Sequence, residues 1–246
     1  MLPSIQIVLV EPSHPGNIGS TARAMKTMNL SQLALVNPKR FPDPQADWRA
    51  AGALLIVKNT RVYESIETAV SQSVVVAATS VRTRHISWPT YTSEEFAQEI
   101  LSNYDATQQV SILFGREDSG LTNEELQLCN VQVTIPSNPE YNSLNLAMAV
   151  QIIAYDLFKY SVLKDGSKKL GDLVEVVEQL ATFTEVEAFY DHLWQVMQLI
   201  EFLDPDEPRE AVVRLRRLFG RIRLEHTEVQ ILRGILSHFE RALEYK

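Results

Sequence analysis

The chain has a single cysteine, Cys129, among its 246 residues. One cysteine cannot form a disulfide within the chain, and it cannot build a zinc site from several thiolates. A chain without disulfides is typical of a reducing compartment. We interpret Cys129 as a small buried side chain rather than a nucleophile.

Long apolar runs are also missing. No uninterrupted run approaches the roughly 20 residues that a bilayer-spanning helix needs, and no basic segment precedes the first apolar run. We therefore expect a cytoplasmic protein with no membrane partner. The five histidines show no metal-like spacing, so we expect no metal: they are His14, His85, His192, His226 and His238.

Positive charge is scarce. Lysine and arginine total 23 against 31 acidic residues, which gives a formal net charge of −8. This balance argues against a protein that binds nucleic acid through its overall field, so only local basic patches could do so. A hydrophobic content of 45% is ordinary for a soluble globule with a sizeable core.

Short β-rich segments alternate with helical patterns through residues 1–163. The predicted strands are Gln6–Val10, Leu33–Val36, Leu54–Val57, Val74–Ala78, Val110–Phe114 and Val131–Ile135. Helical patterns follow Gly16, occupy Trp48–Ala53, Ser65–Ser71 and Ser93–Ser102, and resume after Ser143. Ser93, Thr122 and Asn142-Ser143 are predicted N-caps. This alternation predicts an α/β domain with a mostly parallel sheet and helices on both faces.

The character of the chain changes at residue 164. Residues 164–169 are polar and contain a glycine, and the sequence beyond them has helical patterns only. We predict an α/β domain at 1–163 and a small all-helical domain at 164–246. The predicted helices of the second domain are Leu173–Phe183, Val186–Phe202, Arg209–Leu224 and Glu228–Leu243.

The segment Val110–Phe158 reads as strand, glycine loop, strand, proline loop and helix. Gly115 and Gly120 bracket the acid Glu117, which favours a backbone brought close to a ligand. Both loops follow strand ends, where open parallel sheets place their ligands. Each loop alone is more often structural, but the pair predicts a site.

Three segments then occur in one order: NIGSTARA at 17–24, FGREDSGL at 114–121 and IPSNPEYNSLNLAMAV at 135–150. Together they resemble the three motifs of the SPOUT class of RNA ribose methyltransferases. The resemblance covers the whole chain, is densest in residues 1–160, and is greatest to the bacterial tRNA (cytidine/uridine-2′-O)-methyltransferases of that class.

This resemblance implies a fold with a C-terminal trefoil knot, a homodimer whose active site uses both subunits, and S-adenosyl-L-methionine as methyl donor without a metal. It implies 2′-O-methylation of a cytidine or uridine ribose in tRNA, at nucleotide 32 that opens the anticodon loop. Two alternatives stay open: methylation of another tRNA or rRNA ribose, and an RNA-binding protein without turnover. A dinucleotide-binding enzyme is disfavoured because Gly16 and Gly19 do not form the required glycine pattern.

The resemblance assigns the donor to the loops that follow the strands. Backbone edges would bind adenine and methionine, and apolar side chains would form the walls. The donor-binding residues so predicted are Thr79, Ser80, Val81, Gly115, Ile135, Ser143, Leu144 and Asn145.

The family's catalytic arginine falls on Arg23. A guanidinium stays protonated in proteins and is a poor base. We therefore expect Arg23 to bind the target phosphate or stabilise the developing alkoxide, with proton abstraction only in an unusual environment. Asn17, Glu117, Ser143 and Asn145 would orient Arg23, the donor or the ribose.

Local basic residues would bind the RNA. Arg82 and Arg84 follow the strand Val74–Ala78, and the helix Arg209–Leu224 carries Arg214, Arg217 and Arg221 beside an apolar stripe. Ordinary surface charges and arginines packed along a helix flank are the simpler alternatives. The sequence leaves the second domain open between RNA docking and dimer contacts.

Overall fold

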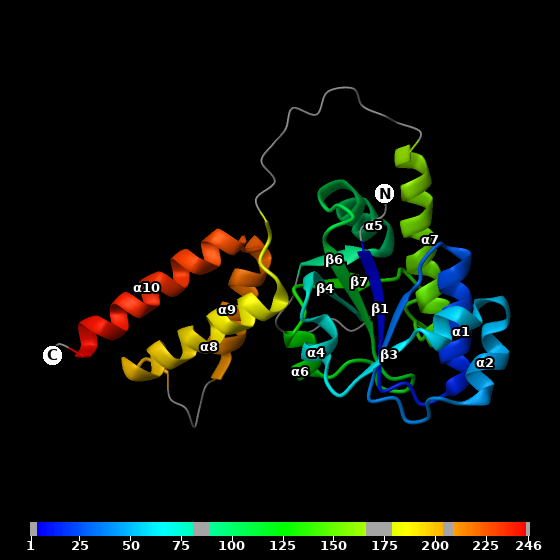
Figure 1. The fold of residues 1–246 in the computed structure, drawn as a ribbon, viewed down its shortest axis with the longest axis horizontal. Helices are drawn as coiled ribbons and strands as arrows, with labels where there is room; N and C mark the ends of the chain where they lie inside the picture. The colour runs from blue at the N-terminus through cyan, green and yellow to red at the C-terminus, as the bar shows by residue number, and fades with distance from the viewer. Residues whose placement is uncertain (1–3, 81–88, 166–178, 204–208, 245–246) are drawn as a thin grey trace. The chain divides into compact units, whose positions relative to one another are not determined.

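The computed structural model describes residues 4–80, 89–165, 179–203 and 209–244 (Figure 1). The chain separates into two compact units, Met1–Asp172 and Leu173–Lys246. Helix α7 (Leu146–Asp165) is the last described element of the first unit. The domain limits 1–163 and 164–246 stay a prediction.

The first unit is built on a parallel sheet. The described residues form seven strands in the order β3-β2-β1-β6-β4-β7-β5, and each pair in that order runs parallel. The strands are β1 (Ser4–Val10), β2 (Gln32–Val36), β3 (Arg61–Tyr63), β4 (Ser73–Thr79), β5 (Thr90–Thr92), β6 (Gln109–Phe114) and β7 (Val131–Thr134). The predicted parallel sheet is confirmed, and the knot stays a prediction.

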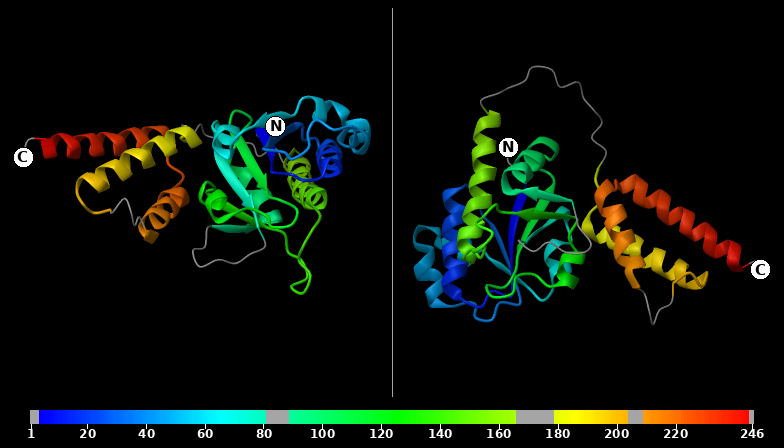
Figure 2. Two further views of the ribbon diagram at one scale, coloured as in Figure 1. Left: turned by 90° about the horizontal axis from the view of Figure 1, so that it is seen from below. Right: turned by 180° about the vertical axis from the view of Figure 1, so that it is seen from behind.

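Helices cover both faces of this sheet, as predicted. One face carries α1 (Pro15–Thr27), α2 (Pro44–Ala50), the 3-10 turn η1 (Ala51–Ala53), α3 (Leu54–Lys58), α5 (Ser93–Asn103) and α7. The other face carries α4 (Ile66–Val70) and α6 (Asn123–Gln127), which Figures 1 and 2 show opposite α1 and α7. This division follows from right-handed crossovers, because the chain changes direction across the sheet after β3, after β5 and again after β6.

The core lies along the three central strands β1, β6 and β4. Ile7, Ile112 and Ala77 are fully buried at matching positions of neighbouring strands. Both faces of these strands are covered, so their sequences are continuous apolar runs rather than alternating ones. The buried polar side chains of these three strands are hydrogen-bonded to one another: the hydroxyls of Ser73 and Ser111 lie 2.7 Å apart, and the Gln6 amide donates to the Ser111 hydroxyl at 3.4 Å.

Two features of the secondary structure differ from expectation. The predicted strand Leu54–Val57 is wrong, because these residues form helix α3, where Leu55 is exposed and Ile56 and Val57 are buried. Strands β3 and β5 were not predicted, and each has only three residues at an edge of the sheet. A four-residue apolar run fits a strand or one buried helical turn equally well, and packing decides between them.

Two of the predicted N-caps are also wrong. The cap of α5 is Thr92, which forms a capping box with Glu95, and Ser93 is already inside the helix. At the start of α7, the side chain of Asn145 rather than Asn142 or Ser143 accepts a hydrogen bond, from the N–H of Ala147 at 3.0 Å. The cap Thr122 of α6 is confirmed, with its capping-box partner Glu125.

The second unit contains α8 (Phe183–Leu199), α9 (Arg209–Ile222) and α10 (His226–Glu244), which confirms three predicted helices. Their core is aromatic, with Phe189 and Phe219 in edge-to-face contact at 4.9 Å between ring centroids. The predicted helix Leu173–Phe183 falls mostly outside the described residues. Residues 179–182 are not helical, and Thr182 is the N-cap of α8.

Candidate active site

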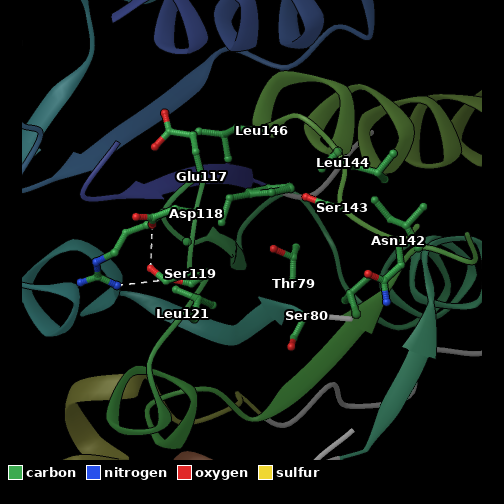
Figure 3. Close-up of a pocket in the computed structure, with 17 residues that line it drawn as sticks. Thr79, Ser80, Glu117, Asp118, Ser119, Leu121, Asn142, Ser143, Leu144 and Leu146 are labelled. Carbon is green, nitrogen blue, oxygen red and sulfur yellow. Dashed lines mark hydrogen bonds between the residues drawn. The ribbon is translucent and has the colours of Figure 1, made fainter. Parts of the chain in front are cut away.

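A pocket of about 350 Å³ opens where strands β4, β6 and β7 end (Figure 3). Residues 114–121, which we call the glycine loop, form one side of it, and residues 142–144 form the opposite side. The predicted donor-binding residues Thr79, Ser80, Gly115, Ile135, Ser143 and Leu144 all line this pocket. Val81 lies outside the described residues.

The glycine loop folds back on itself. The N–H of Arg116 donates to the carbonyl of Gly120 at 3.2 Å, and the N–H of Gly120 donates back to Arg116 at 2.9 Å. A Cβ on Gly115 would lie 2.1 Å from the carbonyl carbon of Gly120, and Gly120 has a φ of 72°. Both glycines are therefore required by geometry, and residues 117–119 are presented to the pocket at the tip of the turn.

Glu117 anchors the glycine loop to the start of α1. Its carboxylate accepts hydrogen bonds from the N–H and hydroxyl of Ser13 at 3.0 and 2.8 Å, from the N–H of His14 at 3.2 Å, and from the Asn17 amide at 2.9 Å. Burial raises the pKa of this carboxyl, but the donors of Asn17 and Ser13 outweigh it and lower the pKa to about 2. Glu117 is thus an ionised structural anchor and is already saturated with donors.

Asn17 connects the other two motifs to this anchor. The Asn145 amide donates to Oδ1 of Asn17 at 3.1 Å, and Asn17 donates to Glu117. One residue from each of the three sequence motifs therefore meets in a single hydrogen-bonded chain. Such a chain fixes the relative positions of α1, the glycine loop and the start of α7.

Sequence reasoning missed two residues of this arrangement, Ser13 and Arg116. Ser13 lies four residues before the first motif, and the sequence carries no local signal for it. Arg116 sits between the predicted Gly115 and Glu117, and its side chain forms ion pairs with Glu11 and Glu125. The only sequence signal for Arg116 was its position inside the second motif, because its partner Glu11 is distant in sequence.

Arg23 lies elsewhere. It is exposed on α1, does not line the pocket, and forms no hydrogen bond or ion pair within the residues that the structure describes. Arg82 and Arg84 fall in 81–88, outside those residues. The structure therefore does not place Arg23 in the pocket of the same chain.

The arginines of α9 belong to the second unit. Arg214 is exposed and pairs with Glu210 at 2.7 Å, and Arg221 is exposed without an ion pair to any described residue. Arg217 is half-buried. Arg216, which was not predicted as an RNA contact, forms a bidentate pair with Glu187 and lies over the ring of Tyr190. Arg216 therefore serves packing.

Across the described ranges, no group of three histidine, cysteine or acidic side chains is arranged to hold a metal. Cys129 is buried, as predicted, and burial raises the pKa of its thiol. None of the described helices is long and apolar enough to cross a bilayer.

A parallel sheet with a glycine loop and an asparagine-capped helix at its carboxyl edge agrees with the SPOUT-type α/β methyltransferase fold that the sequence motifs implied. The SpoU rRNA Methylase family model matches residues 4–155, and the model of the TrmJ tRNA methyltransferase C-terminal domain matches residues 184–246. The chain belongs to the SpoU methylase family, and its second unit is a C-terminal domain of the TrmJ type.

Relatives extend this likeness over the full chain. The tRNA (cytidine/uridine/adenosine-2′-O-)-methyltransferase TrmJ of Pseudomonas aeruginosa is 46% identical over 253 residues, covering 100% of this chain and 98% of the relative. The crystal structure of TrmJ from Z. mobilis ZM4 matches with a TM-score of 0.83 at 33% identity, covering 98% of this chain and 100% of the other. A probable methylase family protein from Haemophilus influenzae matches with a TM-score of 0.66 at 41% identity, covering 100% and 99%.

Proposed function

We propose that this chain transfers a methyl group from S-adenosyl-L-methionine to the 2′-hydroxyl of a cytidine or uridine ribose in tRNA, at nucleotide 32. The observation that carries the proposal is the hydrogen-bonded chain Asn145–Asn17–Glu117, which joins all three motifs beside one pocket. The likeness to tRNA 2′-O-methyltransferases along the whole chain supports the choice of RNA. The cytoplasm, where tRNA is modified, is the proposed location.

The pocket fits a nucleoside-type donor. Its volume of about 350 Å³ falls in the range of small-molecule sites. The glycine loop offers backbone groups that no Cβ shields at Gly115 and Gly120, and Ile135 and Leu144 offer apolar walls. A SpoU methyltransferase from Streptomyces viridochromogenes, which shares this fold at 23% identity, has been solved in complex with the cofactor AdoMet.

Different residues of the chain would have different roles in the reaction. When bound, S-adenosyl-L-methionine supplies a methyl group already activated by a sulfonium, so the protein has to align the reactants and assist loss of the hydroxyl proton. Ser143, Asn145 and Asn17 orient donor or ribose through the fixed start of α7. Arg23 binds the target phosphate or stabilises the developing alkoxide, because its guanidinium stays charged.

Arg23 would come from the partner subunit of a homodimer. It is absent from the pocket of its own chain and exposed on α1. Helix α7, which packs against α1, also exposes an apolar stripe at seven-residue spacing: Met148, Tyr155 and Val162 are 62%, 51% and 56% exposed. An apolar stripe beside an unpaired arginine supports a self-association surface here.

For the RNA, Arg82, Arg84, Arg214, Arg217 and Arg221 stay the proposed contacts. The second unit would use the α9 arginines to dock tRNA. Removal of the residues beyond 164 tests this role: loss of tRNA binding with the dimer retained supports docking, and dissociation supports assembly instead.

The deciding experiment is transfer of labelled methyl from S-adenosyl-L-methionine to unmodified bulk tRNA, followed by nuclease mapping of the labelled nucleotide. A 2′-O-methylated pyrimidine at nucleotide 32 is the expected result. Label on rRNA or at another tRNA nucleotide would contradict the substrate but keep the reaction. Binding of RNA without any transfer would favour the protein without turnover.

A further inference from the structure

We infer that Arg116 is a positioning residue that holds the glycine loop in the shape the donor pocket needs. The inference rests on the proposed donor, S-adenosyl-L-methionine, and concerns a side chain that the proposed reaction does not use. Arg116 lines the pocket together with its neighbours Gly115 and Glu117.

The guanidinium of Arg116 bridges two carboxylates. Its Nε and Nη2 lie 3.0 and 2.7 Å from the two oxygens of Glu11, and its Nη1 and Nη2 each lie 2.9 Å from an oxygen of Glu125. The side chains of Arg116 and Glu125 are only 18% and 15% exposed, and that of Glu11 is 36% exposed. Bidentate pairs of this kind fix geometry and are weakly screened when partly buried.

Each carboxylate brings a different element to the glycine loop. Glu11 directly follows β1 in a left-handed backbone conformation with φ of 47°, and its N–H donates to the carbonyl of Val36 at 2.8 Å. Glu125 lies in α6 and also accepts from the N–H of Thr122 at 2.7 Å. Arg116 therefore ties the first residues of the loop to the end of β1 and to the segment that leaves the loop. A strained residue such as Glu11 persists where its surroundings over-determine it.

Arg116 and Glu117 act as paired anchors on the same neighbouring segment. Arg116 reaches Glu11, while Glu117 accepts hydrogen bonds from Ser13 and Asn17. The tip of the loop, with Asp118 and Ser119, thus directly follows two fixed residues, and Gly120 beyond it is hydrogen-bonded to the backbone of Arg116. Without Arg116, the carboxylates of Glu11 and Glu125 would lose their shared counter-charge and the loop would lose one of its two anchors.

The test is Arg116→Gln in the full chain. We expect the Kd of S-adenosyl-L-methionine and of S-adenosylhomocysteine, measured by calorimetry, to rise by about tenfold because the pocket wall is no longer preorganised. The Kd of unmodified tRNA stays unchanged. In turnover, the KM of the donor rises while kcat at saturating donor changes by less than about twofold.

Arg216→Gln is the matched control. Arg216 forms an equally bidentate pair with Glu187, with side chains 15% and 23% exposed, but it lies in the second unit. Its loss should leave the donor Kd unchanged. Arg116→Lys should recover only part of the affinity, since a single ammonium cannot bond both carboxylates in bidentate fashion.

Three outcomes would contradict either the positioning role of Arg116 or the proposed function. An unchanged donor Kd in a folded Arg116→Gln chain overturns the inference. Equal losses of donor and tRNA affinity also overturn it, because they would show a general structural defect. If the unmodified chain binds neither S-adenosyl-L-methionine nor S-adenosylhomocysteine, the proposed function itself is wrong. Should Arg116→Gln not fold, Glu11→Gln removes one arm of the bridge and carries the same test.

Discussion

Glu117 and Arg23 are held by the chain in opposite ways. Glu117 accepts hydrogen bonds from Ser13, His14 and Asn17 of the same chain, while Arg23 is exposed and contacts no charged or polar partner in the described residues. The pocket proposed to bind the donor is thus preorganised within one chain. Arg23, which is proposed to meet RNA, has no such partner among the described residues, as a charge that must reach another molecule requires.

The largest expected effect comes from Arg23→Ala. We expect methyl transfer to fall by about 100-fold or more, because a group that stabilises developing charge is lost. Donor affinity and melting temperature should not change, since the exposed side chain of Arg23 forms no hydrogen bond or ion pair with the described residues. Labelled-methyl transfer measures turnover, and calorimetry of the same preparation measures donor affinity and melting temperature. Full turnover with tRNA still bound would remove Arg23 from the mechanism.

Gly115→Ala tests directly whether the glycine loop is preorganised. A Cβ there would lie 2.1 Å from the carbonyl carbon of Gly120, so the loop must open at a cost of ~3 kcal/mol, with donor affinity lost. Gly234→Ala in α10 is the control, because no atom lies within 4 Å of its added Cβ. That exposed helical position should gain ~1 kcal/mol in helix propensity. Equal effects of the two substitutions on urea denaturation would refute the crowded loop.

Glu117 makes the anchor dependent on pH in a defined direction, and Glu117→Gln removes that dependence. The folded pKa of Glu117, about 2, is below the ordinary 4.5, so its stabilisation is complete above pH 4.5 and is lost as pH falls towards 2. At pH 7 the substitution should lower the free energy of unfolding by ~2 kcal/mol after allowance for solvent screening. The difference between the two chains should shrink below pH 4.5. A constant difference from pH 7 to pH 3 would mean that the carboxylate charge plays no part.

Arg221→Gln and Arg216→Gln compare two arginines of α9. The first forms no ion pair with the described residues, and the second forms a bidentate pair with Glu187. Arg221 has no ion-pair partner among the described residues, so its loss should reduce the salt dependence of tRNA binding by about one in the slope of log Kd against log salt. Stability should stay within ~0.5 kcal/mol. Arg216→Gln should instead destabilise the second unit by ~1 kcal/mol through loss of the Glu187 pair, with little change in tRNA affinity. Filter binding at several salt concentrations distinguishes the two.

The sequence predicted the central strands well because β1, β4 and β6 are continuous apolar runs that suit only a position covered on both faces. It failed at Leu54–Val57, which is too short for its pattern to decide between strand and helix. It failed again at β5, whose three residues are polar and depend on pairing with β7. Short elements carry little local information, so their neighbours determine them.

The candidate site likewise has features that the sequence predicts and features that only the tertiary structure decides. Sequence alone predicted that Gly115, Glu117 and Asn145 lie near one edge of the sheet, because glycine turns and helix caps are local and strand ends of a parallel sheet meet at one edge. Tertiary structure alone decided that Glu117 is saturated by Ser13 and Asn17, and that Arg116 bridges Glu11 and Glu125. Those contacts join residues about a hundred positions apart or across a turn, and nothing in the local chain specifies which donor a carboxylate meets.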